Sequence, residues 1–151
     1  PGYRIGWVAA GRYAGLIQRQ KLSTSLATTV PVQIAMADYL RQGGYENHLR
    51  HLRRSLAAQE AALVAAIEAH FPEGTRLARP QGGYFLWLEL PRRVDALALH
   101  RQALAQGISI APGPIFSAKR EFGHCIRLNF GHPVDARSLE AAATLGRLLA
   151  A

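Results

Sequence analysis

The sequence predicts an α/β protein in which helices cover a small sheet. Its 151 residues are about the length of one domain. The composition, with 49% hydrophobic and 19% charged residues, is typical of an ordinary globular protein. The apolar spacing is mostly helical before residue 71 and typical of short strands after it. The expected order is two or three helices followed by β-β-α-β-β-α, which is an α/β arrangement.

The first part of the chain is predicted to form one strand and two helices. Residues 3–10 are an apolar run typical of a buried strand, and residues 12–22 have the pattern of a short helix. A polar loop is expected over residues 23–29. Pro31 suits the first turn of a second helix, which the glycine pair at 43–44 would end.

A long amphipathic helix is predicted over residues 45–70. Its apolar stripe consists of Leu49, Leu52, Leu56, Leu63 and Ile67. At 1.5 Å per residue such a helix spans roughly 40 Å. That length is large for so small a domain, so we expect this helix to connect two bodies of protein.

Two strands and a helix are expected next. Residues 75–79 form the first strand, and residues 83–90 form a stronger one that is apolar on both faces and is therefore expected to be covered on both. Asp95 is a suitable N-cap for a helix that ends before Gly107.

The last third of the sequence predicts two more strands and a final helix. A short strand over 108–111 leads into a turn at 112–114. A further strand is expected over 125–130. Asp135 can cap the final helix, which would run almost to the end of the chain.

Charge and cysteine content restrict the partners. The formal net charge is +8, which suits nucleic acid, an acidic partner or anionic ligands. The dense basic run at 48–54 keeps helical leucine spacing, so it is interpreted as the solvent-exposed (wet) face of a helix, with a phosphate-contacting patch as the alternative.

The single cysteine, Cys125, excludes a disulfide within the chain and indicates a cytoplasmic protein. No apolar run approaches the roughly 18 residues of a membrane helix, so no membrane partner is expected.

Two arginines are candidate binding residues. In the strand over 125–130 the even-numbered residues are apolar and share one face, so Arg127 lies on the other face with Cys125 and Asn129. A guanidinium on a rigid strand suits bidentate carboxylate binding, and an ordinary solvent-facing arginine is the alternative.

Arg4 lies within the first predicted strand, where burial would require an anionic partner from the protein or a ligand phosphate. His48 and His51 have no suitably spaced carboxylate, so we expect no metal site.

Four segments together resemble fold-type-I aminotransferases, in the order and spacing of that family. They are residues 1–8 (PGYRIGWV), 80–88 (PQGGYFLWL), 107–117 (GISIAPGPIFS) and 126–130 (IRLNF). The resemblance covers nearly the whole chain. It implies the C-terminal portion of that fold, with pyridoxal 5'-phosphate as cofactor, Arg4 on the cofactor phosphate and Arg127 on the substrate α-carboxylate. It also implies that Gly83 and Tyr84 lie at the substrate.

Within this family the chain looks most like the MocR subgroup of GntR-type bacterial regulators. The segments that carry this likeness are residues 20–25 (QKLSTS), 43–54 (GGYENHLRHLRR) and 108–113 (ISIAPG). Those regulators join an N-terminal winged helix, which binds DNA, to an aminotransferase-like body that senses an amino acid or amine. The likeness therefore implies a homodimer whose DNA contact lies in a domain outside this chain.

The family's Schiff-base lysine has no counterpart here, since neither Lys21 nor Lys119 lies in a matching motif. We expect it upstream of Pro1, in a longer parent protein, so the chain holds no catalytic residue and is expected to be inert alone. Residues 1–43 would be the tail of the large cofactor-binding domain, and residues 44–151 the connecting helix and small domain. The alternatives are a fragment of a stand-alone class I/II aminotransferase, which moves an amino group from an amino acid to a 2-oxo acid, and a module that only binds or dimerises.

Overall fold

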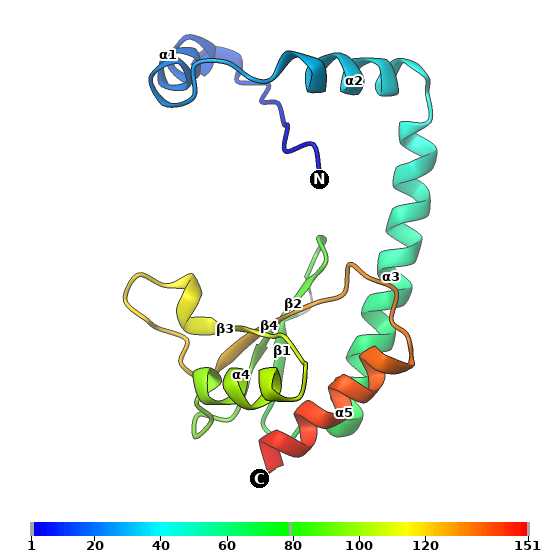
Figure 1. The fold of residues 1–151 in the computed structure, drawn as a ribbon, viewed down its shortest axis with the longest axis vertical. Coiled ribbons are helices and arrows are strands. Elements are labelled where there is room, and N and C mark those ends of the chain that lie inside the picture. The colour runs from blue at the N-terminus through cyan, green and yellow to red at the C-terminus, as the bar shows by residue number, and fades with distance from the viewer. Residues whose placement is uncertain (1, 79, 151) are drawn as a thin grey trace. The chain divides into compact units, whose positions relative to one another are not determined.

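The computed structural model describes residues 2–78 and 80–150 (Figure 1). By its internal contacts the chain divides into two compact units, Pro1–His51 and Leu52–Ala151. Helix α3 (Tyr45–His70) begins in the first unit and ends in the second. Among the described residues, no helix is both long and apolar enough to cross a membrane.

The first unit contains helical segments and an irregular start. The segments are η1 (Gly11–Tyr13), α1 (Ala14–Thr24), α2 (Val30–Arg41) and the first turns of α3. The two predicted helices are confirmed, although α1 runs on into the expected loop. Pro31 lies in the first turn of α2, as predicted.

The strand predicted over residues 3–10 is wrong for this structure. Residues 4–10 adopt neither helix nor strand, and Trp7 is 75% exposed. A strand is stable only when its backbone groups pair with a neighbouring strand, and the described part of this unit contains none. No described residue of the unit is buried. Its apolar side chains, such as Leu22, Val30 and Ile34, are therefore left without a core of their own.

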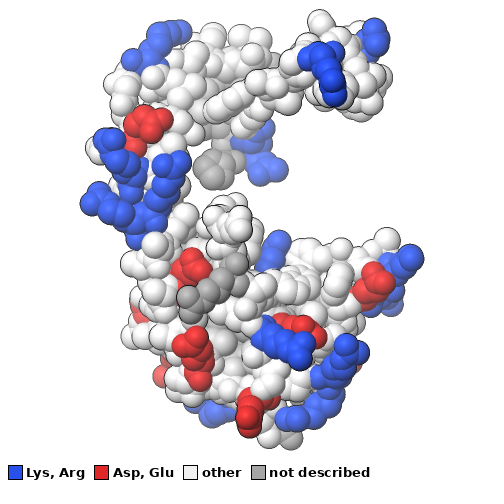
Figure 2. Space-filling view, turned by 180° about the vertical axis from the view of Figure 1, so that it is seen from behind, with Lys and Arg blue, Asp and Glu red and all other residues white. Residues whose placement is uncertain are grey.

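Helix α3 has the bounds that the sequence predicts. Its buried residues lie near its C-terminal end and are Leu63, Val64, Ala66 and Ile67. Leu56 packs partly against the same core, whereas Leu52 is 39% exposed, so the predicted stripe is buried only over the second half of the helix. Arg50, Arg53 and Arg54 of α3 are exposed, as expected for a wet face. Figure 2 shows a group of Lys and Arg side chains gathered on one part of the surface.

The second unit is built on a four-stranded antiparallel sheet of order β1-β2-β4-β3. The strands are β1 (Arg76–Ala78), β2 (Phe85–Glu89), β3 (Ala111–Pro112) and β4 (Cys125–Asn129). The predicted order of strands and helices is confirmed; the last residue of the strand expected over 75–79 lies outside the described residues. The strand expected over 108–111 pairs only from Ala111, because the Ile108 N–H still donates to the Ala103 carbonyl at the end of the preceding helix (2.9 Å).

One face of the sheet forms the core. Leu86, Leu88, Ile126 and Leu128 belong to one buried cluster with residues of α3, α4 (Ala96–Ala105) and α5 (Ala136–Ala150). The alternate residues of β2 are only half-buried. The expectation that β2 is covered on both faces is therefore wrong, because all three helices contribute to the cluster on a single face.

Both predicted helix caps are confirmed. The Asp95 Oδ1 accepts hydrogen bonds from the N–H groups of Leu97 (2.8 Å) and Ala98 (3.1 Å) at the start of α4. At the start of α5 the Asp135 Oδ1 accepts from the Ser138 N–H and hydroxyl, both at 2.9 Å. These two bonds, the backbone one first, lower the pKa of Asp135 below its usual value. The caps fix where each helix begins and thereby where it meets the sheet.

Replacing Asp95 by alanine removes a cap and is expected to lower the free energy of unfolding by about 1 kcal/mol. Asp95→Asn keeps an oxygen that accepts from the same N–H groups, so its free energy of unfolding should stay within a few tenths of a kcal/mol of the parent value. Urea unfolding followed by circular dichroism measures both. An equal loss for the two variants would show that the charge, and not the cap geometry, stabilises α4.

Candidate functional site

Arg127 lies on the sheet face opposite helices α3, α4 and α5. It is on β4, opposite Trp87 of β2 and Ala111 of β3. The predicted alternation is confirmed, because Arg127 is half-buried while its neighbours Ile126 and Leu128 are in the core. Two strands therefore flank the backbone that carries this guanidinium, which makes its position rigid.

Two aromatic rings hold the Arg127 guanidinium. Its Cζ lies 4.0 Å from the ring centroid of Phe85 and 4.5 Å from that of Phe116, which ends η2 (Gly113–Phe116). Rings attract a cation through their faces but do not satisfy its N–H donors. Within the described part of the chain, no carboxylate lies within 4.0 Å of this guanidinium. Arg127 is thus oriented by aromatic contacts and still has donors available for an anion.

Two further aromatic residues, Trp87 and Phe122, extend the cluster beside Phe116. Trp87 makes edge contacts with Phe116 at 5.7 Å and with Phe122 at 5.6 Å between centroids. The segment over 113–122, which carries Phe116 and Phe122, packs tightly, because a Cβ on Gly113 would overlap the Phe122 carbonyl oxygen. No role was predicted for these aromatic residues from the sequence. Phe85 and Trp87 could have been found, because they lie two positions apart in a strand and therefore share the face opposite the core.

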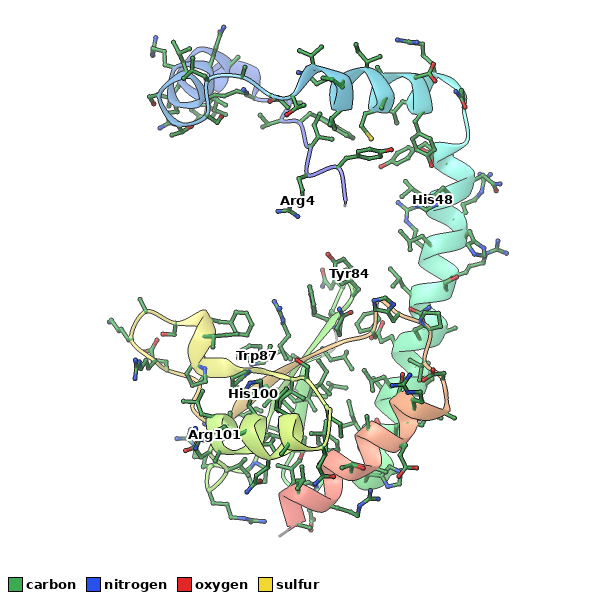
Figure 3. All side chains as sticks on the ribbon, in the orientation of Figure 1. Arg4, His48, Tyr84, Trp87, His100 and Arg101 are labelled. Carbon is green, nitrogen blue, oxygen red and sulfur yellow. The ribbon has the colours of Figure 1, made fainter. Side chains whose placement is uncertain are left out.

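Gly83 and Tyr84 lie at the start of β2. Gly83 has φ of +88°, a left-handed conformation that glycine adopts without strain. The Tyr84 carbonyl accepts from the Phe130 N–H at 2.9 Å, and its ring lies 4.6 Å from that of Phe85. Tyr84 is 44% exposed at the tip of this segment (Figure 3). The structure therefore brings Tyr84 next to a ring that contacts Arg127.

Arg4 belongs to the first unit. It is exposed, has φ of +51°, and its side chain points away from its own segment (Figure 3). No described carboxylate lies within ion-pair distance of it. The burial that the sequence predicts for Arg4 is therefore wrong here, for the same reason that its strand does not form.

Cys125 and Glu89 occupy one end of the same sheet face. Burial raises the pKa of the Cys125 thiol, and the nearby charge of Glu89 raises it further. The Glu89 carboxylate has its own partner in His124, with Nε2 to Oε1 of 3.3 Å. A buried, neutral thiol is a packing residue and not a nucleophile. The described residues contain no group of three or more side chains suited to a metal ion.

Comparison with known proteins identifies the class to which this fold belongs. The family described as "Aminotransferase class I and II" matches residues 1–144. The chain belongs to that family, and the predicted resemblance to fold-type-I aminotransferases is confirmed.

Particular relatives are of two kinds. The uncharacterized helix-turn-helix-type transcriptional regulator YdcR of Escherichia coli is 42% identical over 99% of this chain and 32% of its own length. A kynurenine aminotransferase of Pyrococcus horikoshii, solved with PMP, has a TM-score of 0.87 at 30% identity, over 99% of this chain and 37% of its own.

A third relative is the α-aminoadipate aminotransferase LysN of Thermus thermophilus, solved with N-(5'-phosphopyridoxyl)-L-leucine. It has a TM-score of 0.76 at 29% identity, over 87% of this chain and 34% of its own. The chain spans about a third of the length of each of these relatives.

Proposed function

We propose that this chain is the C-terminal part of the effector-binding body of a GntR/MocR-type transcriptional regulator, and that Arg127 binds the carboxylate of an amino acid effector. One observation carries the ligand assignment. Arg127 is held by Phe85 and Phe116 on the sheet face opposite the three helices, and no described carboxylate pairs with it. A planar guanidinium oriented in this way matches the two oxygens of a carboxylate.

The likeness to YdcR supports the regulator assignment. In this proposal residues 1–43 are the tail of the large domain and residues 44–151 are the connecting helix and small domain. DNA binding lies in a winged helix elsewhere in the full-length protein, which is a cytoplasmic homodimer. Effector binding moves the small domain and so changes how the dimer engages DNA.

Pyridoxal 5'-phosphate is the proposed cofactor of the full-length protein. The donor chemistry fits in part, because Arg4 has an exposed guanidinium without a described carboxylate partner, and such a group suits a phosphate. When bound, the cofactor supplies an aldehyde that reacts with amino groups and a ring that withdraws electrons. Gly83 and Tyr84 would then border the effector beside Arg127. A lysine outside this chain would tether the cofactor, so no residue described here is assigned a catalytic role.

The experiment that tests this function uses the full-length protein loaded with cofactor. Fluorescence anisotropy measures its affinity for DNA from upstream of its own gene while a panel of amino acids and amines is added. One compound is expected to change the DNA affinity at least about fivefold, which is the low end of ordinary allosteric coupling. The same preparation should convert no more than one equivalent of 2-oxoglutarate per site. Unchanged DNA affinity with every compound in the panel would contradict the regulator assignment.

The second candidate is a stand-alone aminotransferase, which the likeness to the kynurenine and α-aminoadipate enzymes favours. There the same residues would bind an amino acid substrate through successive turnovers. Sustained amino transfer to 2-oxoglutarate, combined with an absence of DNA binding, would establish this candidate in place of the regulator.

A further inference from the structure

A second positively charged feature lies in the second unit, apart from Arg127. It is a cleft of about 410 Å³ between the turn that follows β2 and the loop that precedes β4. Arg92 and Arg93 line it from the turn, and Arg120 and His124 line it from the loop. The cleft has no lining residue in common with the aromatic site around Arg127. It is therefore a separate candidate site, and its function does not depend on the role proposed for Arg127.

The arginines of this cleft have no partners within the described residues. Arg92, Arg93 and Arg120 are exposed, and none lies within 4.0 Å of a described carboxylate. Among the described residues that line the cleft, Asp95 is the one acidic side chain, and its Oδ1 already accepts hydrogen bonds from two N–H groups of α4. The carboxylate nearest to His124 is that of Glu89, at 3.3 Å. An excess of positive charge thus remains in the cleft.

Backbone hydrogen bonds hold the two walls together. The Ala96 N–H donates to the Gly123 carbonyl at 2.8 Å, and the Leu90 N–H donates to the His124 carbonyl at 2.9 Å. These bonds join residues that lie 27 and 34 positions apart in the sequence. The loop itself turns sharply at Arg120, whose φ is +55°. The fold therefore brings Arg120 and His124 to the same cavity as the adjacent pair Arg92 and Arg93.

We propose that this cleft binds a small phosphorylated anion. The planar fork of arginine matches phosphate oxygens, and three such groups around one cavity suit a ligand with two or more negative charges. The volume is within the range of small-molecule sites and leaves room for an organic group beyond the phosphate. Among the described residues no Phe, Tyr or Trp lines the cleft, so it lacks the stacking platform that single-stranded nucleic acid requires.

The test is a calorimetric titration of inorganic pyrophosphate into the full-length protein, saturated beforehand with pyridoxal phosphate so that the cofactor's own phosphate site is filled. Saturable binding is expected. The double variant Arg92→Gln and Arg120→Gln should raise the dissociation constant by about 20- to 100-fold, because each arginine loses charge-assisted hydrogen bonds. Arg101→Gln is the matched control: Arg101 is exposed on α4 but does not line the cleft, so pyrophosphate binding should not change (Figure 3). Equal melting temperatures would show that all the variants fold.

Three results would overturn the proposal. One is the absence of saturable pyrophosphate binding. Another is an equal loss in the Arg101→Gln control, which would indicate diffuse charge and not a site. The third comes from a parallel titration with duplex DNA of unrelated sequence: if the double variant weakens DNA binding while pyrophosphate does not bind, the cleft contacts a nucleic-acid backbone instead.

Discussion

Replacing Arg127 by glutamine in the full-length, cofactor-loaded protein is expected to raise the dissociation constant of the effector by about 100-fold. The substitution removes two charge-assisted hydrogen bonds to the effector carboxylate, and each contributes on the order of 1.5 kcal/mol or more. The rings of Phe85 and Phe116 would remain, but they cannot donate to an anion. The change in the cofactor's absorbance on effector addition measures the constant.

Two companion variants make this result specific. Arg127→Lys keeps the positive charge but loses the planar fork, so its constant should be intermediate, about tenfold above the parent. Arg101→Gln removes an exposed charge from α4 and should leave effector binding unchanged. An unchanged constant in Arg127→Gln would remove the carboxylate role from Arg127. If amines that lack a carboxylate act as effectors and bind Arg127→Gln as tightly as the parent, Arg127 would likewise lose its proposed role in carboxylate binding.

Replacing Gly146 by alanine is expected to lower the free energy of unfolding of the second unit by about 3 kcal/mol. Gly146 lies in α5 where this helix crosses the end of α3. A Cβ there would overlap the His70 carbonyl oxygen and would lie 2.8 Å from the His70 carbonyl carbon. The obstacle is backbone and not a flexible side chain, so one helix must shift. That shift would disturb the packing of Leu145 and Leu149 in the core.

Gly123→Ala provides the control for this prediction. A Cβ on Gly123 meets nothing within 4 Å, and its φ lies outside the left-handed region. Its free energy of unfolding should therefore stay within about 0.5 kcal/mol of the parent. Amide hydrogen exchange of the β2 and β4 residues, which report on this core, measures both variants. A loss below about 1 kcal/mol in Gly146→Ala would show that α5 has room to move away from α3.

Local patterns in the sequence were enough to predict much of the fold. The bounds of α3 follow from helical spacing between the glycine pair at 43–44 and the break at Phe71. Asp95 and Asp135 were identified as caps because a cap depends only on residues two or three positions away. The face on which Arg127 lies follows from strand alternation, a period-two rule within a single strand.

The contacts of Arg127 could not be predicted in the same way. Phe85 and Phe116 come from segments that are distant in the sequence and meet only because β2 and η2 both adjoin β4. The same holds for the cleft, where hydrogen bonds between two segments bring Arg120 to the adjacent pair Arg92 and Arg93.

The sequence therefore determined the helices, the order of the strands in the second unit, where α4 and α5 are capped and which way Arg127 faces, because these features depend on near neighbours. Only the tertiary structure decided that β2 is covered on one face, that β3 pairs from Ala111, and that the segment over 3–10 stays exposed. Each of these outcomes depends on which partner a backbone or side chain meets across space. Apolar spacing shows that a face must be covered, but it does not identify the partner that covers it.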